Sequence, residues 1–275
     1  MSFEVNIASA ILSAYRQRQG IFETTTDLLE NQIIPGVDPG SEEHARFYFY
    51  LIYNDHGTKS ATLYARFRNL YAEKPQLFDP AYLSKHSSGN DDPPSFLRDA
   101  ISGLGLRYPK QSLISWWSNT LQLIKSYEGE PINLFRSTSD AVELFGRVRS
   151  FRGYGPKTSG LLIRVIVGMG FHHLNNLRKV PVPVDVHDTR IAYWTGLYRP
   201  ERSGIDPGHL SEDAVHIKSV SALWQKIARQ LHEPWPELDR ALWLLGSRGC
   251  VGRRCQLCPV RQWCEEGLRV LNSGG

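Results

Sequence analysis

Apolar side chains recur along most of the chain at the three- and four-residue spacing that places them on one face of a helix. The third such stripe, for example, consists of Leu113, Ile114, Trp117, Leu121 and Ile124. The six stripes lie at residues 7–15, 63–71, 113–124, 161–169, 220–231 and 238–245. Alternation with a period of two, which is typical of strands, is scarce. The pattern therefore predicts an all-α protein.

The segments between the stripes contain the residues that favour loops. Ser, Gly, Asp and Pro cluster at 84–95 and 199–208, and the VPVPV run at 180–184 is expected to be extended. The longest apolar run, Leu161 to Phe171, is interrupted by Arg164 and is shorter than the about 20 residues that a membrane span needs. The first 20 residues lack the pattern of a secretory signal. We expect an intracellular (cytoplasmic or nucleoid) protein without a membrane partner.

The charge is small overall but unevenly distributed. The 275 residues are 41% hydrophobic and 22% charged, which is ordinary globular usage, and the formal net charge is +4. Residues 145–199, however, hold nine Lys or Arg and two Asp, and residues 245–275 hold five Arg and two Glu. Two basic segments in an otherwise acidic chain indicate a surface for a polyanion.

The first basic segment contains the pattern helix, tight turn, helix. Gly153 and Gly155 permit left-handed backbone angles and close approach, and Pro156 suits the first position of a helix. A helix that starts after such a turn can bind a phosphate, with Arg147, Arg149 and Arg152 close by. Thr158 and Pro156 occupy positions where a Rossmann fingerprint and a P-loop need glycine, so both are excluded. The alternative is a simple turn between two core helices.

Lys157 and Asp185 are the candidate catalytic residues. Lys157 is expected in the first turn of a helix, where the positive end of the helix dipole disfavours an ammonium. A lysine of this kind beside a carboxylate is the arrangement of an amine nucleophile and its activator. Asp188 is the rival carboxylate, and Asp185 is preferred because it follows the extended segment.

All four cysteines lie within 15 residues, as C-x4-C-x2-C-x5-C. Disulfides are disfavoured in an intracellular chain. Zinc sites usually separate two ligand pairs by a dozen or more residues, whereas this compact spacing suits an iron–sulfur cubane. The predicted ligands of a [4Fe–4S] cluster are Cys250, Cys255, Cys258 and Cys264, and zinc is the alternative.

Three segments together resemble a known family. FRGYGPKTSGLLIRV is similar to the helix-hairpin-helix of the endonuclease III (HhH-GPD) family of DNA glycosylases, VDVHDTRI to its aspartate segment, and GCVGRRCQLCPVRQWC to its iron–sulfur loop. Weaker similarity places NDHGTKSATLYARF (54–67) and ISGLGLRYPKQSLI (101–114) at the two loops that probe DNA. The resemblance extends from about residue 45 onward.

The resemblance implies a bifunctional DNA glycosylase and abasic-site lyase that acts as a monomer on double-stranded DNA with a damaged or mismatched base. Lys157 would be the nucleophile and Asp185 its activator, and the cluster would be structural. Oxidised pyrimidines are the default substrate. A uracil or thymine mismatch glycosylase and a non-catalytic DNA-binding module with a structural metal are the alternatives. The implied DNA contacts are Gly153, Gly155, Arg152, His56, Leu106, Arg107, Arg253 and Arg254.

The implied fold has two helical domains with the active site in the cleft between them. A central helical barrel domain with the hairpin spans 30–170, and residues 1–29 and 171–275 form a discontinuous iron–sulfur domain. Two departures from the family pattern stand out. Lys157 and Asp185 are 28 residues apart, roughly ten more than the family pattern, and we place the insertion at GFHHLNNLRKVP, where it could contact substrate. Four residues separate the first two cysteines, where the family usually has six.

Overall fold

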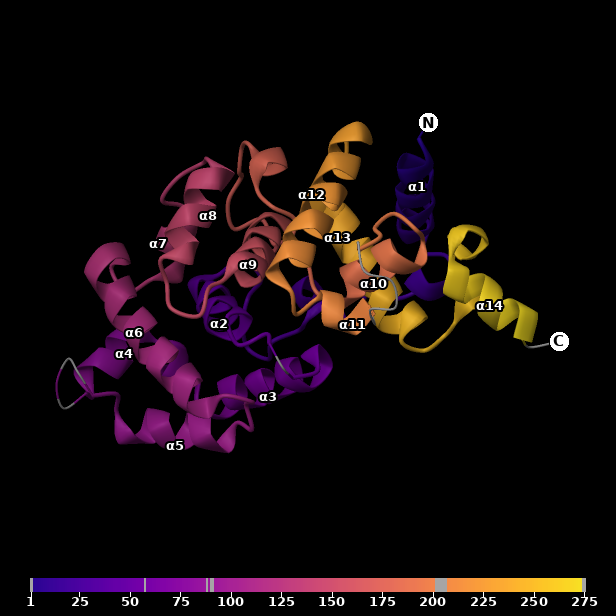
Figure 1. The fold of residues 1–275 in the computed structure, drawn as a ribbon. Coiled ribbons are helices and arrows are strands. Elements are labelled where there is room, and N and C mark those ends of the chain that lie inside the picture. Colours follow the sequence, from indigo (N-terminus) through magenta and orange to yellow (C-terminus); the bar gives the residue numbers. More distant parts are fainter. Residues whose placement is uncertain (1, 57, 88, 90–91, 201–206, 274–275) are drawn as a thin grey trace. The chain divides into compact units, whose positions relative to one another are not determined.

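The computed structural model describes residues 2–56, 58–87, 89, 92–200 and 207–273 (Figure 1). Within these ranges all regular secondary structure is helical, and an isolated bridge joins Asp140 to Asn175. The predicted all-α fold is confirmed. The expected loop residues 201–206 lie outside the described residues.

The chain divides into two compact units. Unit 1 combines Met1–Asn31 with Pro181–Gly275, and unit 2 is Gln32–Val180. The second boundary therefore lies at 180/181 and not at 170/171. The reason is that residues 171–180 pack within unit 2, where the Phe171 ring contacts Phe135 at 5.5 Å and the Asn175 N–H donates to the Ser139 carbonyl at 2.8 Å.

Unit 2 is built around the aromatic helix α2 (Glu42–Ile52). Its residues 47–52 are fully buried, and Tyr50 stacks on Trp116 with ring centroids 4.5 Å apart. Trp116 belongs to the long helix α6 (Pro109–Tyr127). The other helices of the unit are α3 (Ser60–Glu73), α4 (Pro80–Lys85), α5 (Ser95–Gly103), α7 (Pro131–Phe135), α8 (Ala141–Arg149) and α9 (Pro156–Gly168).

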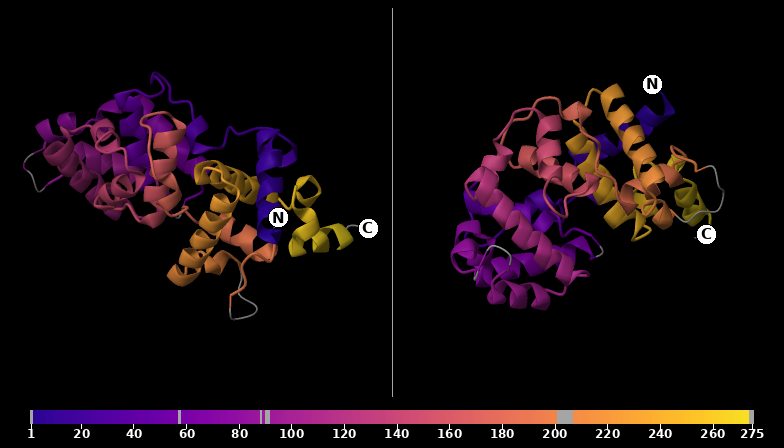
Figure 2. Two further views of the ribbon diagram at one scale, coloured as in Figure 1. Left: turned by 90° about the horizontal axis from the view of Figure 1, so that it is seen from above. Right: turned by 60° about the vertical axis from the view of Figure 1, so that its left-hand side comes forward.

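Unit 1 joins segments from opposite ends of the sequence. Helix α1 (Phe3–Arg16) buries Ile7 and Ile11 completely and packs against α12 (Ala214–Gln230) and α13 (Trp235–Leu244). Figure 2 shows this indigo helix beside the orange and yellow helices. Arg16 adds ion pairs to Glu233 at 2.5 Å and Glu237 at 2.7 Å. The remaining helices are α10 (Val186–Trp194), α11 (Pro207–Leu210) and α14 (Glu265–Ser273).

Candidate functional site

Helices α8 and α9 form the predicted hairpin, and its two glycines serve different purposes. Gly153 has a φ of +86°, and a Cβ there would lie 3.3 Å from the Tyr53 ring. Gly155 is the N-cap of α9 with a φ of −85°, and its N–H donates to the Thr158 hydroxyl at 3.0 Å. Position 153 requires glycine because of both its left-handed backbone and the nearby Tyr53 ring. Position 155 does not.

The turn is held from behind by buried side chains. Asn119 of α6 is fully buried, and its amide brackets the Arg152 backbone: Nδ2 donates to the Arg152 carbonyl at 2.9 Å and Oδ1 accepts from the Arg152 N–H at 2.8 Å. The Tyr154 hydroxyl donates to the Phe49 carbonyl at 2.7 Å. The backbone of the turn is thereby fixed while the Arg152 side chain is exposed.

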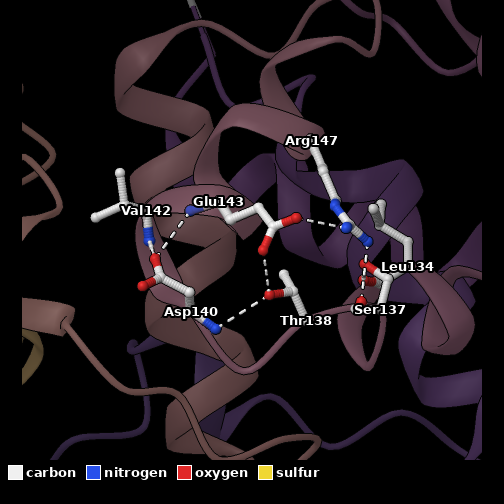
Figure 3. A network of polar contacts seen from close by, with 7 residues as sticks. All are labelled: Leu134, Ser137, Thr138, Asp140, Val142, Glu143 and Arg147. Atoms are coloured by element: carbon white, nitrogen blue, oxygen red, sulfur yellow. Dashed lines mark hydrogen bonds and ion pairs between the residues drawn. The ribbon is translucent and has the colours of Figure 1, made fainter.

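Arg147, in the last turn of α8, contacts residues at the start of that helix and just before it, so it is part of a structural network. Its guanidinium donates to the Ser137 carbonyl at 2.9 Å and to Glu143 at 2.6 Å (Figure 3). Glu143 in turn accepts from Thr138, which accepts from the N–H of Asp140, the N-cap of α8. The same Asp140 accepts from Asn176 at 2.6 Å.

The insertion around residues 171–180 therefore braces the start of α8. This end of α8 is opposite to the Gly153–Gly155 turn, which follows the last residue of that helix. The expected contact of this insertion with substrate stays a prediction.

Lys157 lies at the second position of α9, as predicted, and its amine meets a residue that the sequence did not single out. Nζ donates to the Asp55 carbonyl at 3.1 Å and forms an ion pair with Asp55 Oδ2 at 3.6 Å. The Asp55 side chain is 8% exposed and that of Lys157 is 35% exposed. The two residues are 102 positions apart, so no spacing rule connects them.

The loop residues His56 and Arg107 both contact Tyr108, a residue that the sequence pattern did not indicate. Tyr108, 41% exposed, stacks on His56 with ring centroids 5.8 Å apart, and the Arg107 guanidinium lies 5.2 Å from the same ring. Burial lowers the pKa of His56, and the charges of Lys157 and Arg107 lower it further. These groups form one neighbourhood of unit 2.

Leu106 does not join this exposed group. Its side chain is in the core, with 8% exposure, so this structure does not present it at the surface, and its implied contact with DNA stays a prediction. The exposed apolar side chain of the loop is Tyr108, two residues later.

Asp185 and Asp188 have separate roles at the start of α10 in unit 1. Asp185 is the half-buried N-cap, and its carboxylate accepts from the His187 N–H at 2.7 Å. Asp188 is buried, and its Oδ2 accepts from the Asp185 N–H at 2.9 Å. Burial, followed by the charges of Asp185 and Asp239, raises the pKa of Asp188 well above its usual value. Asp188 is thus a structural carboxyl, and Asp185 is the more accessible one.

The four cysteines of unit 1 are free thiols that line a single cavity. Burial raises the pKa of Cys250 to about 12 and that of Cys258 to about 11, and the neighbouring thiols contribute in the same direction. Four thiolates at this cavity would repel one another, so their ionisation calls for a positively charged group. Among the described residues, no group of three or more His, Cys, Asp or Glu side chains is arranged around the position of a single metal ion.

The arginines of the cysteine loop also divide into two kinds. Arg248 is tied down by an ion pair to Asp27 at 2.5 Å, and Arg261 donates to the Gln256 carbonyl at 3.1 Å. Arg253 and Arg254 are exposed and line the rim of the cysteine cavity.

None of the helices in the described part of the chain has the length and apolar character to cross a membrane.

Comparison with known proteins identifies the fold. No family model and no curated protein matches the sequence. The structure is similar to the crystal structure of the 8-oxoguanine DNA glycosylase of Thermotoga maritima, with a TM-score of 0.50 and 17% identity, covering 88% of this chain and 93% of that chain. The helical fold of the chain is thus of the kind found in that protein.

Proposed function

We propose that the protein is a DNA glycosylase with abasic-site lyase activity that excises damaged bases from double-stranded DNA. The observation that carries the proposal is Lys157, whose partly exposed amine is held by Asp55 at the start of the second hairpin helix. The likeness of the fold to a DNA glycosylase and the exposed Arg152 beside the turn add to it.

In the proposed reaction the neutral Lys157 amine attacks C1′ of a nucleotide turned out of the duplex. The N–C1′ bond forms as the glycosidic bond breaks, and the base leaves with the bonding electrons. Ring opening gives a Schiff base, and β-elimination then releases the 3′ phosphate. The Asp185 carboxylate would stabilise positive charge that develops on the sugar.

The cysteine loop is proposed to hold a [4Fe–4S] cluster through Cys250, Cys255, Cys258 and Cys264. Four thiols on one cavity, of which that of Cys264 is buried and the other three are partly exposed, are a suitable donor set, and the cluster's positive iron would offset their charge. When bound, the cluster would give the loop a fixed shape, with Arg253 and Arg254 exposed toward a phosphate backbone.

Two substrate classes compete. Oxidised pyrimidines follow from the resemblance of the motifs to endonuclease III, and the structural neighbour acts on 8-oxoguanine, an oxidised purine. A panel of duplexes, each with a single lesion or a uracil or thymine mismatch, separates these candidates. The duplex from which the protein releases a base identifies the substrate.

Borohydride trapping tests the lysine directly. Wild-type protein is expected to form a covalent adduct with a duplex that carries an abasic site, and Lys157→Ala is expected to form none. An adduct that persists in Lys157→Ala would refute the assignment. Binding without strand cleavage or base release by the wild type would favour the non-catalytic DNA-binding module.

A further inference from the structure

We infer that Asp55 positions Lys157 and accepts the proton that its ammonium must lose before the amine can attack. The inference rests on the proposed function, because it assigns a partner to the proposed nucleophile. It adds a second carboxylate to the reaction, distinct from Asp185.

The contacts of Asp55 suit this role. Two groups of this one residue face the amine: the carbonyl oxygen at 3.1 Å and Oδ2 at 3.6 Å. The other carboxylate oxygen, Oδ1, accepts from the Ser60 hydroxyl at 3.3 Å. The carboxylate is therefore fixed on one side by the first residue of α3 and directed on the other toward Lys157.

The surrounding helices explain why the pair is needed. Lys157 stands in the first turn of α9, where the helix dipole disfavours a positive charge. Asp55 follows the end of α2, where the dipole is negative, and its 8% exposed carboxylate needs a counter-charge. Asp55 supplies the negative charge that the Lys157 ammonium needs, and Lys157 supplies the counter-charge for the Asp55 carboxylate.

The proton transfer balances within this pair. One N–H bond of the Lys157 ammonium breaks, its proton goes to Asp55 Oδ2, and the electron pair stays on Nζ for attack at C1′. The Asp55 carboxyl becomes neutral. The carbonyl of Asp55 still accepts a hydrogen bond from the neutral amine, so the orientation of Nζ is kept while its charge is lost.

The test compares Asp55→Asn with wild type by the rate of borohydride trapping on an abasic-site duplex between pH 6 and pH 10. General-base removal is expected to slow trapping at pH 7 by about 100-fold. The defect should shrink toward pH 10, where Lys157 of the Asp55→Asn variant loses its proton to solvent. A carboxylate that only stabilised the ammonium would slow trapping by the wild type, so its removal would not slow the variant. An Asn variant that traps as fast as wild type at pH 7 would therefore overturn the inference.

Asp99→Asn is the matched control, because Asp99 is an exposed carboxylate of the same unit. It is expected to trap at the wild-type rate. Thermal unfolding and binding to a duplex with a tetrahydrofuran abasic analogue show whether Asp55→Asn still folds and binds.

A second measurement does not depend on activity. NMR titration of Lys157 is expected to give a pKa at least about one unit higher in wild type than in Asp55→Asn, because the carboxylate stabilises the ammonium. Equal values would overturn the inference. If the wild type traps on no duplex but the NMR difference is present, the proposed function fails while the pairing of Asp55 with Lys157 stands.

Discussion

Single residues decide which parts of the hairpin tolerate change. At Gly153 the backbone is left-handed and the space is filled by Tyr53, whereas at Gly155 the backbone is extended and a Cβ would meet open space within 4 Å. Gly153→Ala should lower the free energy of unfolding by about 1–2 kcal/mol, and Gly155→Ala, the control, by roughly 0.5 kcal/mol. Urea unfolding measures both. Equal losses would contradict the distinct roles of the two glycines.

The exposed loop aromatic gives a prediction about activity. We expect the exposed Tyr108 ring, which contacts His56 and Arg107, to stack on a base of the lesion duplex. Tyr108→Ala should therefore lower base release about tenfold, by the loss of one stacking interaction of about 1–3 kcal/mol. Tyr108→Phe keeps the ring and should retain the rate.

Leu106→Ala provides the contrast at the neighbouring position. Because Leu106 is a core residue, the substitution should lower stability by about 2–5 kcal/mol. Base release lost in Leu106→Ala without a loss of stability would indicate instead that this side chain contacts DNA.

Asp188 predicts a dependence of stability on pH. Its pKa is raised in the folded state, mainly by burial and then by Asp185 and Asp239, so the folded protein binds its proton more tightly than the unfolded chain. This contribution to stability is complete below the unfolded pKa and is lost as the pH rises through the folded pKa. Asp188→Asn should gain stability relative to wild type between pH 4 and pH 7. A difference that stays constant with pH would contradict the assignment.

Among the elements, α6 shows what the sequence pattern could and could not predict. The spacing correctly predicted a helix, but Ile114 and Ile124 of the predicted stripe are 48% and 36% exposed. The buried face carries Trp117 of the predicted stripe, and beside it four polar residues, Ser112, Ser115, Asn119 and Thr120. Asn119 binds the hairpin turn, and Thr120 bonds the Tyr50 hydroxyl at 2.7 Å. Hydrophobic periodicity cannot identify such a face, because hydrogen-bond partners distant in sequence make its burial favourable.

Asn119→Ala tests the support of the turn. It leaves the N–H and carbonyl of Arg152 without their partner, so stability should fall by about 2–4 kcal/mol and the affinity for duplex DNA should fall with it. Gln122→Ala, on the same helix, removes only an exposed contact with Ser150 and should change neither measurement. Unchanged DNA affinity in Asn119→Ala would show that the turn does not depend on this clamp.

At the scale of the whole molecule, features that depend on residues close in sequence could be predicted. Contacts between residues distant in sequence could not. The hairpin, Lys157 in the first turn of its helix and the grouping of the four cysteines all follow from local spacing. The pairing of Asp55 with Lys157 and the contact of Tyr108 with His56 do not, because they depend on loops brought together by packing in unit 2. The extent of residues 171–180 within unit 2 was missed for the same reason.

The proposed cluster gives a prediction for unit 1. Protein purified without oxygen should be brown, absorb near ~400 nm and contain iron, and oxidative removal of the cluster should make the segment 250–264 sensitive to proteolysis. The helices of unit 2 should persist, since no cysteine lies in that unit. Colourless anaerobic protein with one zinc per chain would contradict the cluster.

The return of the chain to unit 1 at residue 181 also sets an order for its folding during synthesis. Helix α1 is synthesised before unit 2, yet the helices that cover Ile7 and Ile11 are made only after all of unit 2. Unit 2 can fold as soon as its own residues have been synthesised. The apolar face of α1 stays uncovered until α12 and α13 have been made. Helix α1 is therefore synthesised before unit 2 but can complete its packing only after unit 2 has been made.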